Sequence, residues 1–486
     1  MSSLIFYPTS PKEALVKEFV GKSIADVPTP AAVMNVAAAR RNCERMLEAA
    51  KKLDLGWRAH VKTHKTVELT RLQVGEDPSR PANLIVSTLS EAEFVLPLLE
   101  EYKKKGRRVN FVYGLPISKG AVPRLAEVVK VLGEGSISIL LDDPAQLAAA
   151  AELKKQSGVA PLAHIKIDMG GRRAGVVESS ERFVEVANAA LEAHKAGSLI
   201  LSGLYSHAGH SYGGDSRVAA IKMLYAEIDA MLRGADRLSQ KAKELGVQIP
   251  TLVVSAGASP TALSVQNLLG GQDEARDSET GTPELKAAVT ELSELFKTVK
   301  SKGHAVEIHA GVYPTLDLQQ LAAHSLSSST LSWRDIALTV VAEVHSVYPG
   351  RGENGTDEAL IGAGGLALGR EFCKAYDGMA MVTPWGRQGV EMPACDVEDH
   401  EGWTVGRFSQ EHGILTWAAG KGRREKTKEG ALGKPTDAVE AGQKVRLWPN
   451  HACITSSHFG WYFVVDEDRA GHEDEIVDVW IKARGW

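Results

Sequence analysis

The sequence predicts an α/β protein that consists of a (β/α)8 TIM-type barrel and a second, all-β domain. Short β-branched or aliphatic segments alternate with helical segments over about 300 residues, and a turn rich in glycine or polar residues follows each strand candidate. After residue 330 the strand-like runs are separated by loops with little helix. The alternation favours a closed parallel barrel over a doubly wound sheet, although periodicity alone does not separate the two folds.

The expected elements follow in order along the chain. Residues 1–27 have the composition of a helical segment, 28–34 form a turn that enters a buried strand, and 36–53 are again helical in composition. A β-rich run at 336–347 opens the second domain. The other expected strands are 84–87, 109–113, 138–141, 163–168, 200–205 and 251–255, and helical stretches include 90–101 and 215–245.

Length and composition are consistent with two domains. The chain has 486 residues, of which 44% are hydrophobic, so it can bury a large core and exceeds the usual size of a single one. We expect the barrel domain at 28–325. The mainly β domain is expected to combine 1–27 with 326–486.

Charge and cysteine content narrow the function class. The formal net charge of −5, with both signs interspersed, disfavours nucleic acid and anionic membranes as partners. No apolar run approaches the roughly 20 residues of a membrane span, and four cysteines do not make a disulfide scaffold. The N-terminus lacks the basic flank and apolar core of a secretory signal. We therefore expect a cytoplasmic enzyme that acts on a small molecule, with the basic loop at 421–428 exposed to solvent.

The stretch 58–65 contains two lysines and two histidines. If it is extended, His60, Lys62 and His64 share one side while Lys65 faces the other, so only one lysine can share a site with the histidines. A desolvated lysine near cationic or polar groups has a lowered pKa, and a neutral amine is what Schiff-base chemistry needs. The alternative is a basic strand end in solvent.

Polar and glycine-rich clusters lie where other strands are expected to end, at 168–173, 206–210 and 255–259. Barrel enzymes place their chemistry at the carboxyl ends of the strands. The turns with Ser and Thr at 255–261 and around Gly311 can present backbone N–H groups to a phosphate.

Near the C-terminus, His451 and Cys453 form a candidate metal pair. On a strand the two side chains project from the same face, which suits a shared metal ion. His458 is either a third ligand or a loop histidine. Because most zinc sites have three or four protein ligands, a half-buried pair without a metal is the alternative.

These motifs together resemble a known family. The chain is similar to the fold-type III pyridoxal-phosphate enzymes, whose barrel is shared with alanine racemase, and within them to the eukaryotic-type D-serine dehydratase and D-threonine aldolase family. The resemblance covers nearly the whole chain. It is carried by PTPA at 28–31, RAHVKTHK at 58–65, KIDMGGRRAG at 166–175, YSHAGH at 205–210, VSAGASPT at 254–261 and PNHAC at 449–453.

The resemblance assigns cofactor-binding roles. It makes Lys62 the lysine that holds pyridoxal 5'-phosphate, with Lys65 as the alternative, and it places Arg173 at the phenolic oxygen and His207 beside the pyridine ring. His309 stands where alanine racemase has an arginine that faces the pyridine nitrogen, and this departure leaves the partner of that nitrogen open. Tyr205 is implied to line the pocket, and the phosphate is implied to be held by the segments of Ser255, Gly257, Ser259, Thr261, Gly311 and Val312.

The same resemblance bears on the metal. Dehydratases of this group resemble His-x-Cys proteins and the aldolases His-x-Asp proteins, so His451-Ala452-Cys453 implies the dehydratase branch. The cysteine favours zinc over magnesium or manganese because of the softness of its sulfur.

The implied reaction is elimination of water from D-serine to give pyruvate and ammonia, with Lys62 as the catalytic base. Three alternatives stay open: a D-threonine aldolase, a dehydratase of another D-3-hydroxy amino acid such as D-threo-3-hydroxyaspartate, and an amino-acid racemase. A non-catalytic pyridoxal-phosphate carrier is disfavoured by the β domain. The family also implies a homodimer, in which the pair His451 and Cys453 completes either its own site or that of the neighbouring subunit.

Overall fold

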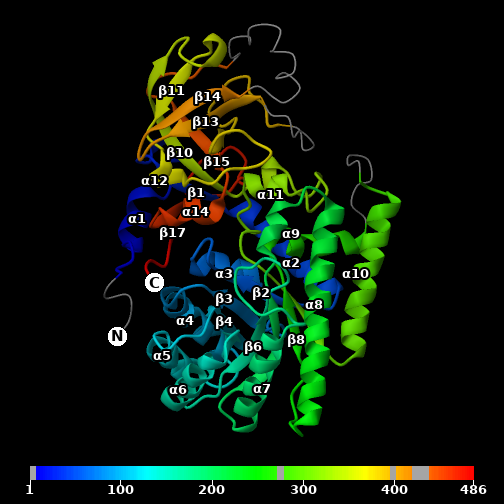
Figure 1. Ribbon diagram of the computed structural model, residues 1–486. Helices are drawn as coiled ribbons and strands as arrows, with labels where there is room; N and C mark the ends of the chain where they lie inside the picture. The colour runs from blue at the N-terminus through cyan, green and yellow to red at the C-terminus, as the bar shows by residue number, and fades with distance from the viewer. Residues whose placement is uncertain (1–6, 271–278, 394–400, 419–436) are drawn as a thin grey trace.

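The computed structural model describes residues 7–270, 279–393, 401–418 and 437–486. The basic loop expected at 421–428 lies outside these ranges. Eight parallel strands close into a barrel in chain order, which confirms the predicted fold class (Figure 1). They are β2 (Gly56–His60), β3 (Ala82–Val86), β4 (Val109–Pro116), β5 (Ile137–Leu141), β6 (Leu162–Ile167), β7 (Ile200–Ser206), β8 (Val253–Ala256) and β9 (Ala305–Ala310).

Helices surround the barrel and connect its strands. Most of their N-termini are capped by the side chains that such positions favour; for example, Ser216 accepts a hydrogen bond from the amide of Ala219 at the start of α8. The surrounding helices are α2 (Val36–Lys52), α3 (Val67–Val74), α4 (Leu89–Lys104), α5 (Val122–Leu132), α6 (Leu147–Ser157), α7 (Glu181–Lys195), α8 (Arg217–Glu244) and α10 (Pro283–Ser301).

The second sheet has nine strands in the order β11-β14-β13-β12-β15-β10-β1-β16-β17. All of its pairings are antiparallel except that of β1 with β16. The strands are β1 (Ala31–Asn35), β10 (Leu338–Tyr348), β11 (Glu358–Ile361), β12 (Ala380–Val382), β13 (Gly402–Phe408), β14 (Gly413–Ala418), β15 (Lys444–Pro449), β16 (Trp461–Val465) and β17 (Asp478–Ile481).

Strand β1 belongs to this second sheet although it falls inside the range 28–325 expected for the barrel domain. Ala31 pairs with Val341 of β10, and Val33 pairs with Phe463 of β16. The barrel therefore begins at β2. The domain bounds themselves stay a prediction.

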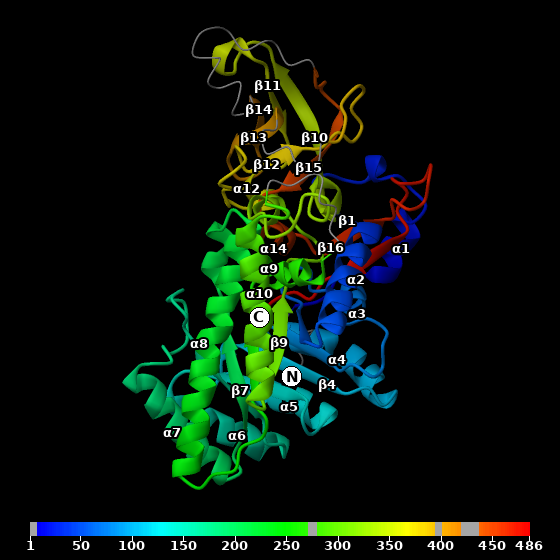
Figure 2. The same ribbon diagram turned by 90° about the vertical axis from the view of Figure 1, so that its right-hand side faces the viewer.

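The sheet lies at one end of the barrel, and short helices fill the junction (Figures 1 and 2). These are α9 (Ser259–Ser264), α11 (Leu318–Ala322), α12 (Gly365–Leu368) and α14 (Ala452–Ser457), while α1 (Lys12–Phe19) packs beside β17. Within the described ranges, no helix combines the length and the hydropathy that crossing a lipid bilayer would require.

The barrel interior contains a buried polar layer. Arg58 of β2 donates through Nε to Glu307 Oε1 of β9 at 2.6 Å and through Nη1 to Asn110 Oδ1 at 2.7 Å. Glu307 Oε1 also accepts from Ser255 Oγ at 2.8 Å. Burial raises the pKa of Glu307, but the charge of Arg58 and the hydrogen bonds from Arg58 and Ser255 outweigh it and lower the pKa. The carboxylate is therefore ionised, and the two buried charges neutralise each other.

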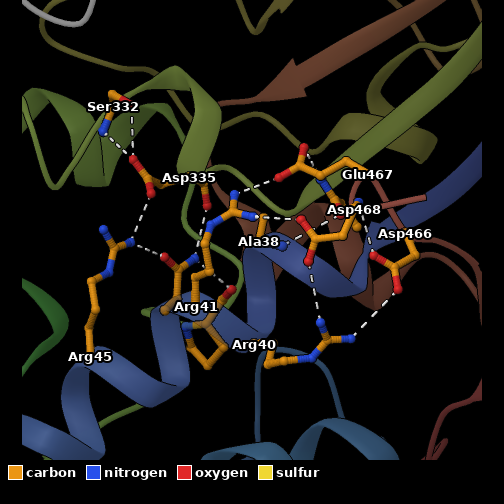
Figure 3. Close-up of polar contacts among 12 residues, drawn as sticks. Ala38, Arg40, Arg41, Arg45, Ser332, Asp335, Asp466, Glu467 and Asp468 are labelled. Atoms are coloured by element: carbon orange, nitrogen blue, oxygen red, sulfur yellow. Dashed lines mark hydrogen bonds and ion pairs between the residues drawn. The ribbon is translucent and has the colours of Figure 1, made fainter. Parts of the chain in front are cut away.

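Helix α2 is tied to the second sheet by polar contacts (Figure 3). Arg41 contacts Glu467 at 2.5 Å, on the segment that follows β16, and Arg45 contacts Asp335 at 2.8 Å. The buried Asn42 donates through Nδ2 to the carbonyl oxygens of Pro314 and Asp335, at 3.0 and 2.9 Å. Helix α2 thus fixes the orientation of β1 and the barrel relative to each other.

The Asn42→Ala substitution is expected to lower the free energy of unfolding by about 1–3 kcal/mol, because it leaves two buried carbonyl groups without a donor. Arg41→Ala is the matched control, since its half-exposed ion pair with Glu467 contributes about 0–1 kcal/mol. Urea denaturation of the two variants measures the difference. Equal losses would contradict the role given to the buried amide.

Candidate active site

The loop that carries Lys62 begins where strand β2 ends. Residues after His60 form a turn, so the expectation that His60, Lys62 and His64 share one side is wrong. The buried His64 instead contacts Thr66 Oγ1 at 3.0 Å and Gln73 Oε1 at 2.9 Å. Side chains alternate only while the backbone stays extended, and the turn breaks that rule.

The two lysines of the loop differ in their surroundings. Lys65 adopts a positive φ of 56°, and its Nζ lies 3.1 Å from the buried Glu91 Oε1. Lys62 is half-buried, and its charge acts on both His60 and His207. Lys62, unlike Lys65, therefore lies near the histidines at the barrel end.

The second domain anchors this loop. Its contacts come from helix α14, strand β16 and the segment after β17, all more than 380 positions away along the chain. They are Thr63 Oγ1 to Cys453 Sγ at 3.0 Å, Ser456 Oγ to the Thr63 carbonyl at 2.5 Å, Tyr462 OH to the His64 carbonyl at 3.2 Å and the Ala483 amide to the Lys65 carbonyl at 2.9 Å.

Aromatic rings gather at the ends of β7 and β9. The rings of Tyr205 and His309 stack with centroids 4.4 Å apart, and the His207 ring lies 6.3 Å from that of His309. Burial lowers the pKa of His309 to about 3, and burial together with the charge of Lys62 lowers the pKa values of His60 and His207. His60, His207 and His309 are therefore neutral.

The polar layer fixes the tautomer of His309. The hydroxyl of Ser255 donates its proton to the Glu307 carboxylate, so towards His309 Nδ1, at 3.1 Å, the same hydroxyl accepts. His309 Nδ1 then carries the proton, and Nε2 carries a lone pair. Nε2 is buried, and the described residues offer it no hydrogen-bond partner. The barrel end thus presents a single, defined acceptor atom.

The glycine-rich turns place backbone without side chains at the same end of the barrel. Gly257 has a φ of 149°, and a Cβ there would lie 2.1 Å from the His309 carbonyl oxygen; its own carbonyl accepts from His207 Nδ1 at 2.7 Å. At Gly311 a Cβ would lie 3.2 Å from the His60 Cβ, a looser approach. Ser259 Oγ accepts from the Val312 amide at 3.1 Å, and the Ser259 hydroxyl also faces Tyr212. Thr261 is different, because its hydroxyl both accepts from and donates to Ala258.

Arg173 is exposed on the loop after β6. Its positive charge acts on both Tyr205 and His207. At Tyr205 it opposes the larger effect of burial, which raises the pKa, and at His207 it adds to burial and lowers the pKa further. The structure therefore brings Arg173 together with the ring cluster, as the sequence predicts for residues around one site.

His451 and Cys453 also lie at this end, but not on a strand. Strand β15 ends at Pro449, His451 is the N-cap residue of α14, and Cys453 lies in its first turn, so the expected strand geometry is wrong. The helix start is held by Asp317, whose Oδ2 accepts from the Ala452 amide at 2.8 Å. His458 is exposed at the other end of α14, which excludes it as a partner of the pair.

The two side chains interact with each other. Burial lowers the pKa of His451, but its contact with Cys453 and the charges of Cys453, Asp317 and Glu371 raise it to about 9. Burial raises the pKa of Cys453, but the His451 contact and charge, the charge of Lys62 and the Thr63 hydrogen bond lower it overall. The sulfur therefore has thiolate character next to Lys62.

Comparisons with known proteins agree with this arrangement. The family model described as "Alanine racemase, N-terminal domain" matches residues 34–276, and the one described as "Putative serine dehydratase domain" matches 337–465. D-serine dehydratase of Schizosaccharomyces pombe is 36% identical, over 99% of this chain and 97% of that protein. The D-serine dehydratase of Saccharomyces cerevisiae is 28% identical, over 97% of this chain and 99% of that protein.

The chain belongs to the D-serine dehydratase family. Among solved structures, D-threo-3-hydroxyaspartate dehydratase from Delftia sp. HT23 has the same fold, with a TM-score of 0.65, 24% identity and coverage of 96% of this chain and all of that one. The alanine racemase-like barrel of the family is consistent with pyridoxal phosphate as the cofactor.

The site residues fit such a cofactor. Glycine-containing turns such as those at Gly257 and Gly311 can present backbone amides to a phosphate. An aromatic ring with a nitrogen needs a defined partner, which the unpaired His309 Nε2 provides. An amine for covalent attachment is present in Lys62.

The metal pair has the donor types that zinc prefers, an imidazole and a thiolate. His451 Nδ1 is buried without a hydrogen bond, and Glu371 Oε2 is 3.6 Å away. Within the described ranges, no three His, Cys, Asp or Glu side chains are grouped so as to hold a metal ion. Two protein donors are fewer than the three or four of most zinc sites.

Sequence reasoning missed several residues of the site. Thr63 carries no signal beyond its place next to Lys62. Lys166 of β6 is buried with its Nζ 4.7 Å from the centroid of the Tyr205 ring, and burial lowers its pKa to about 8. Glu227 gives a readable signal, because a carboxylate on the buried face of α8, between Leu224 and Met231, interrupts an apolar stripe.

Glu227 lies beneath the turns after β7 and β8. Its carboxyl group faces the Ser206 hydroxyl and the amides of Gly257 and Ala208, although neither carboxyl oxygen makes a hydrogen bond of regular geometry. Burial raises its pKa from 4.5 to about 7, against the opposing effect of these groups and of Lys166. The folded protein therefore holds a proton here that the unfolded chain releases at lower pH.

The contribution of Glu227 to stability is accordingly expected to fall between about pH 4.5 and pH 7, since this group binds fewer protons in the unfolded state there. Glu227→Gln removes this dependence. The free energy of unfolding of the variant minus that of the wild type should rise by on the order of 3 kcal/mol from pH 4.5 to pH 8. Denaturant titrations at both pH values measure it. A difference that stays constant or falls would contradict the raised pKa.

Proposed function

We propose that the protein is a D-serine dehydratase that depends on pyridoxal phosphate and zinc, a lyase that eliminates water from D-serine to give pyruvate and ammonia. The observation that carries this proposal is the contact of Thr63 with Cys453. It brings the loop of the candidate cofactor lysine and the candidate metal thiolate together at one barrel end. The 36% identity to a full-length D-serine dehydratase supports the choice of substrate.

The chain's own residues would divide the work. Lys62 would hold the cofactor and, once released, take the proton from the α-carbon at its Nζ. His309 would offer its lone pair on Nε2 to the cofactor ring. Tyr205, stacked on His309, keeps the imidazole in place. The phosphate would bind at the turn that contains Gly257 and Ser259.

Bound pyridoxal phosphate supplies an electron sink for the α-carbon. Zinc supplies a Lewis acid for the β-hydroxyl: it lowers the pKa of water from 15.7 to about 9, a change equivalent to roughly 9 kcal/mol, of which a leaving hydroxide would realise a part. His451 and Cys453 would hold the zinc, and His451 is set by its place at the start of α14.

The surroundings of the metal pair favour serine over 3-hydroxyaspartate. Asp317 and Glu371 place negative charge beside His451, which would repel a second substrate carboxylate. The nearby Lys374 donates to the carbonyls of Gly213 and Gly214, so its ammonium group is already engaged. A cytoplasmic homodimer with no nucleic-acid or membrane partner remains part of this proposal.

Lys62→Ala is expected to abolish both the absorbance of covalently bound cofactor and the formation of pyruvate. Lys65→Ala is the matched control, because its amine pairs with Glu91, and it should keep the cofactor. Absorbance spectra and a pyruvate assay measure both effects. Covalent cofactor retained in Lys62→Ala would assign the attachment to another lysine, with Lys65 tested first.

Removal of metal by a chelator is expected to stop dehydration of D-serine while the cofactor stays bound, and added zinc should restore it. The assay compares D-serine, L-serine and D-threonine with and without zinc and identifies pyruvate, 2-oxobutyrate, glycine or inverted amino acid. Full activity without metal would refute the zinc role. Glycine as the main product from D-threonine, with no pyruvate from D-serine, would indicate the aldolase instead.

A further inference from the structure

Thr63 is placed between the two halves of the site. It follows Lys62 directly, it is buried, and its Oγ1 lies 3.0 Å from Cys453 Sγ, which is 390 positions away along the chain. This is a direct side-chain contact between the lysine loop and the metal pair.

Both partners of this contact are held rigidly. Ser456, on the same helix α14 as Cys453, donates to the carbonyl oxygen of Thr63, so the helix holds the backbone of Thr63 as well as its side chain. The start of α14 is fixed in turn by Asp317. Because a β-branched side chain has few χ1 rotamers, the position of the Thr63 hydroxyl follows from that of its backbone.

We propose that Thr63 is a positioning residue for a divalent cation: its hydroxyl donates to the Cys453 sulfur and holds it in the orientation in which it binds the cation together with His451. A thiolate can only accept hydrogen bonds, so in the metal-bound state Thr63 must be the donor. This inference rests on the zinc role in the proposed function.

The contact links the two binding events. Displacement of the Lys62 loop would move the Thr63 hydroxyl and weaken its hold on the sulfur. Such coupling is reciprocal, so cofactor binding and metal binding strengthen each other. The loop of Lys62 thus sets the metal affinity of a helix in the other domain.

The test uses the cofactor-loaded protein, stripped of metal and titrated with zinc in competition with a chromophoric chelator. Thr63→Val keeps the shape but removes the donor, and it should weaken zinc binding by about 10–100-fold, the usual cost of removing a group that orients a ligand. Thr63→Ser should keep the wild-type affinity. Thr455→Val is the matched control, since it removes a buried hydroxyl of α14 that donates to the Leu368 carbonyl. This variant should also keep the wild-type zinc affinity. Equal zinc affinity in Thr63→Val and the wild type would overturn the proposal.

Cobalt(II) in place of zinc gives a second readout that a purely structural role would not move. A hydrogen bond to the thiolate stabilises the sulfur electrons, so the sulfur-to-cobalt charge-transfer band should move to lower energy in Thr63→Val and stay in place in Thr63→Ser. An unmoved band in Thr63→Val would show that the hydroxyl does not donate to the sulfur. If the valine variant does not fold, Thr63→Ala takes its place, and the same changes in zinc affinity and in the cobalt band support or overturn the proposal.

These measurements involve no turnover, so they separate the inference from the function. Weaker zinc binding in Thr63→Val by a protein that does not dehydrate D-serine would refute the proposed function and support the inference. Zinc-dependent dehydration of D-serine, with unchanged zinc affinity in Thr63→Val, would support the proposed function and refute the inference. A wild-type protein that binds neither zinc nor cobalt would overturn both.

Discussion

The site depends on the buried ion pair between Arg58 and Glu307. It joins the first barrel strand to the last, and neither charge is tolerable in the interior without the other. Glu307 accepts a hydrogen bond from Ser255, and Ser255 in turn sets which nitrogen of His309 carries a proton. The charge pair that joins the first and last barrel strands therefore also fixes which nitrogen of His309 has a lone pair to offer to a cofactor ring.

The other half of the site is supplied from outside the barrel. A turn just after β2 would be free to move if only its own strand held it, but helix α14, strand β16 and the segment after β17 all bond to it. Catalytic groups act only when they are held within fractions of an ångström of a productive geometry. The nine-stranded sheet is thus part of the active site and not an appendage to a complete barrel.

The sequence allowed the barrel and the second sheet to be predicted, because strand periodicity and strand-end glycines are local signals. The site residues themselves stay a prediction. The failures arise where geometry is set by distant residues. Nothing in residues 31–35 tells an apolar barrel strand from a strand that pairs with Val341 and Phe463. His64 was misplaced because a turn ended the alternation. The strand assumed for His451 ends at Pro449, and a short helix begins at Ala452.

The position of β1 has a consequence for how the molecule is made. A ribosome delivers the barrel sequence early, yet β1 must wait for β10 and then for β16 before its two edges are covered. The anchors of the lysine loop arrive later still, with Tyr462 and Ala483. Nascent chains therefore stay without a formed site until the segment after β17 has been made. A gene split between barrel and sheet would yield two fragments, neither of which could assemble the site alone.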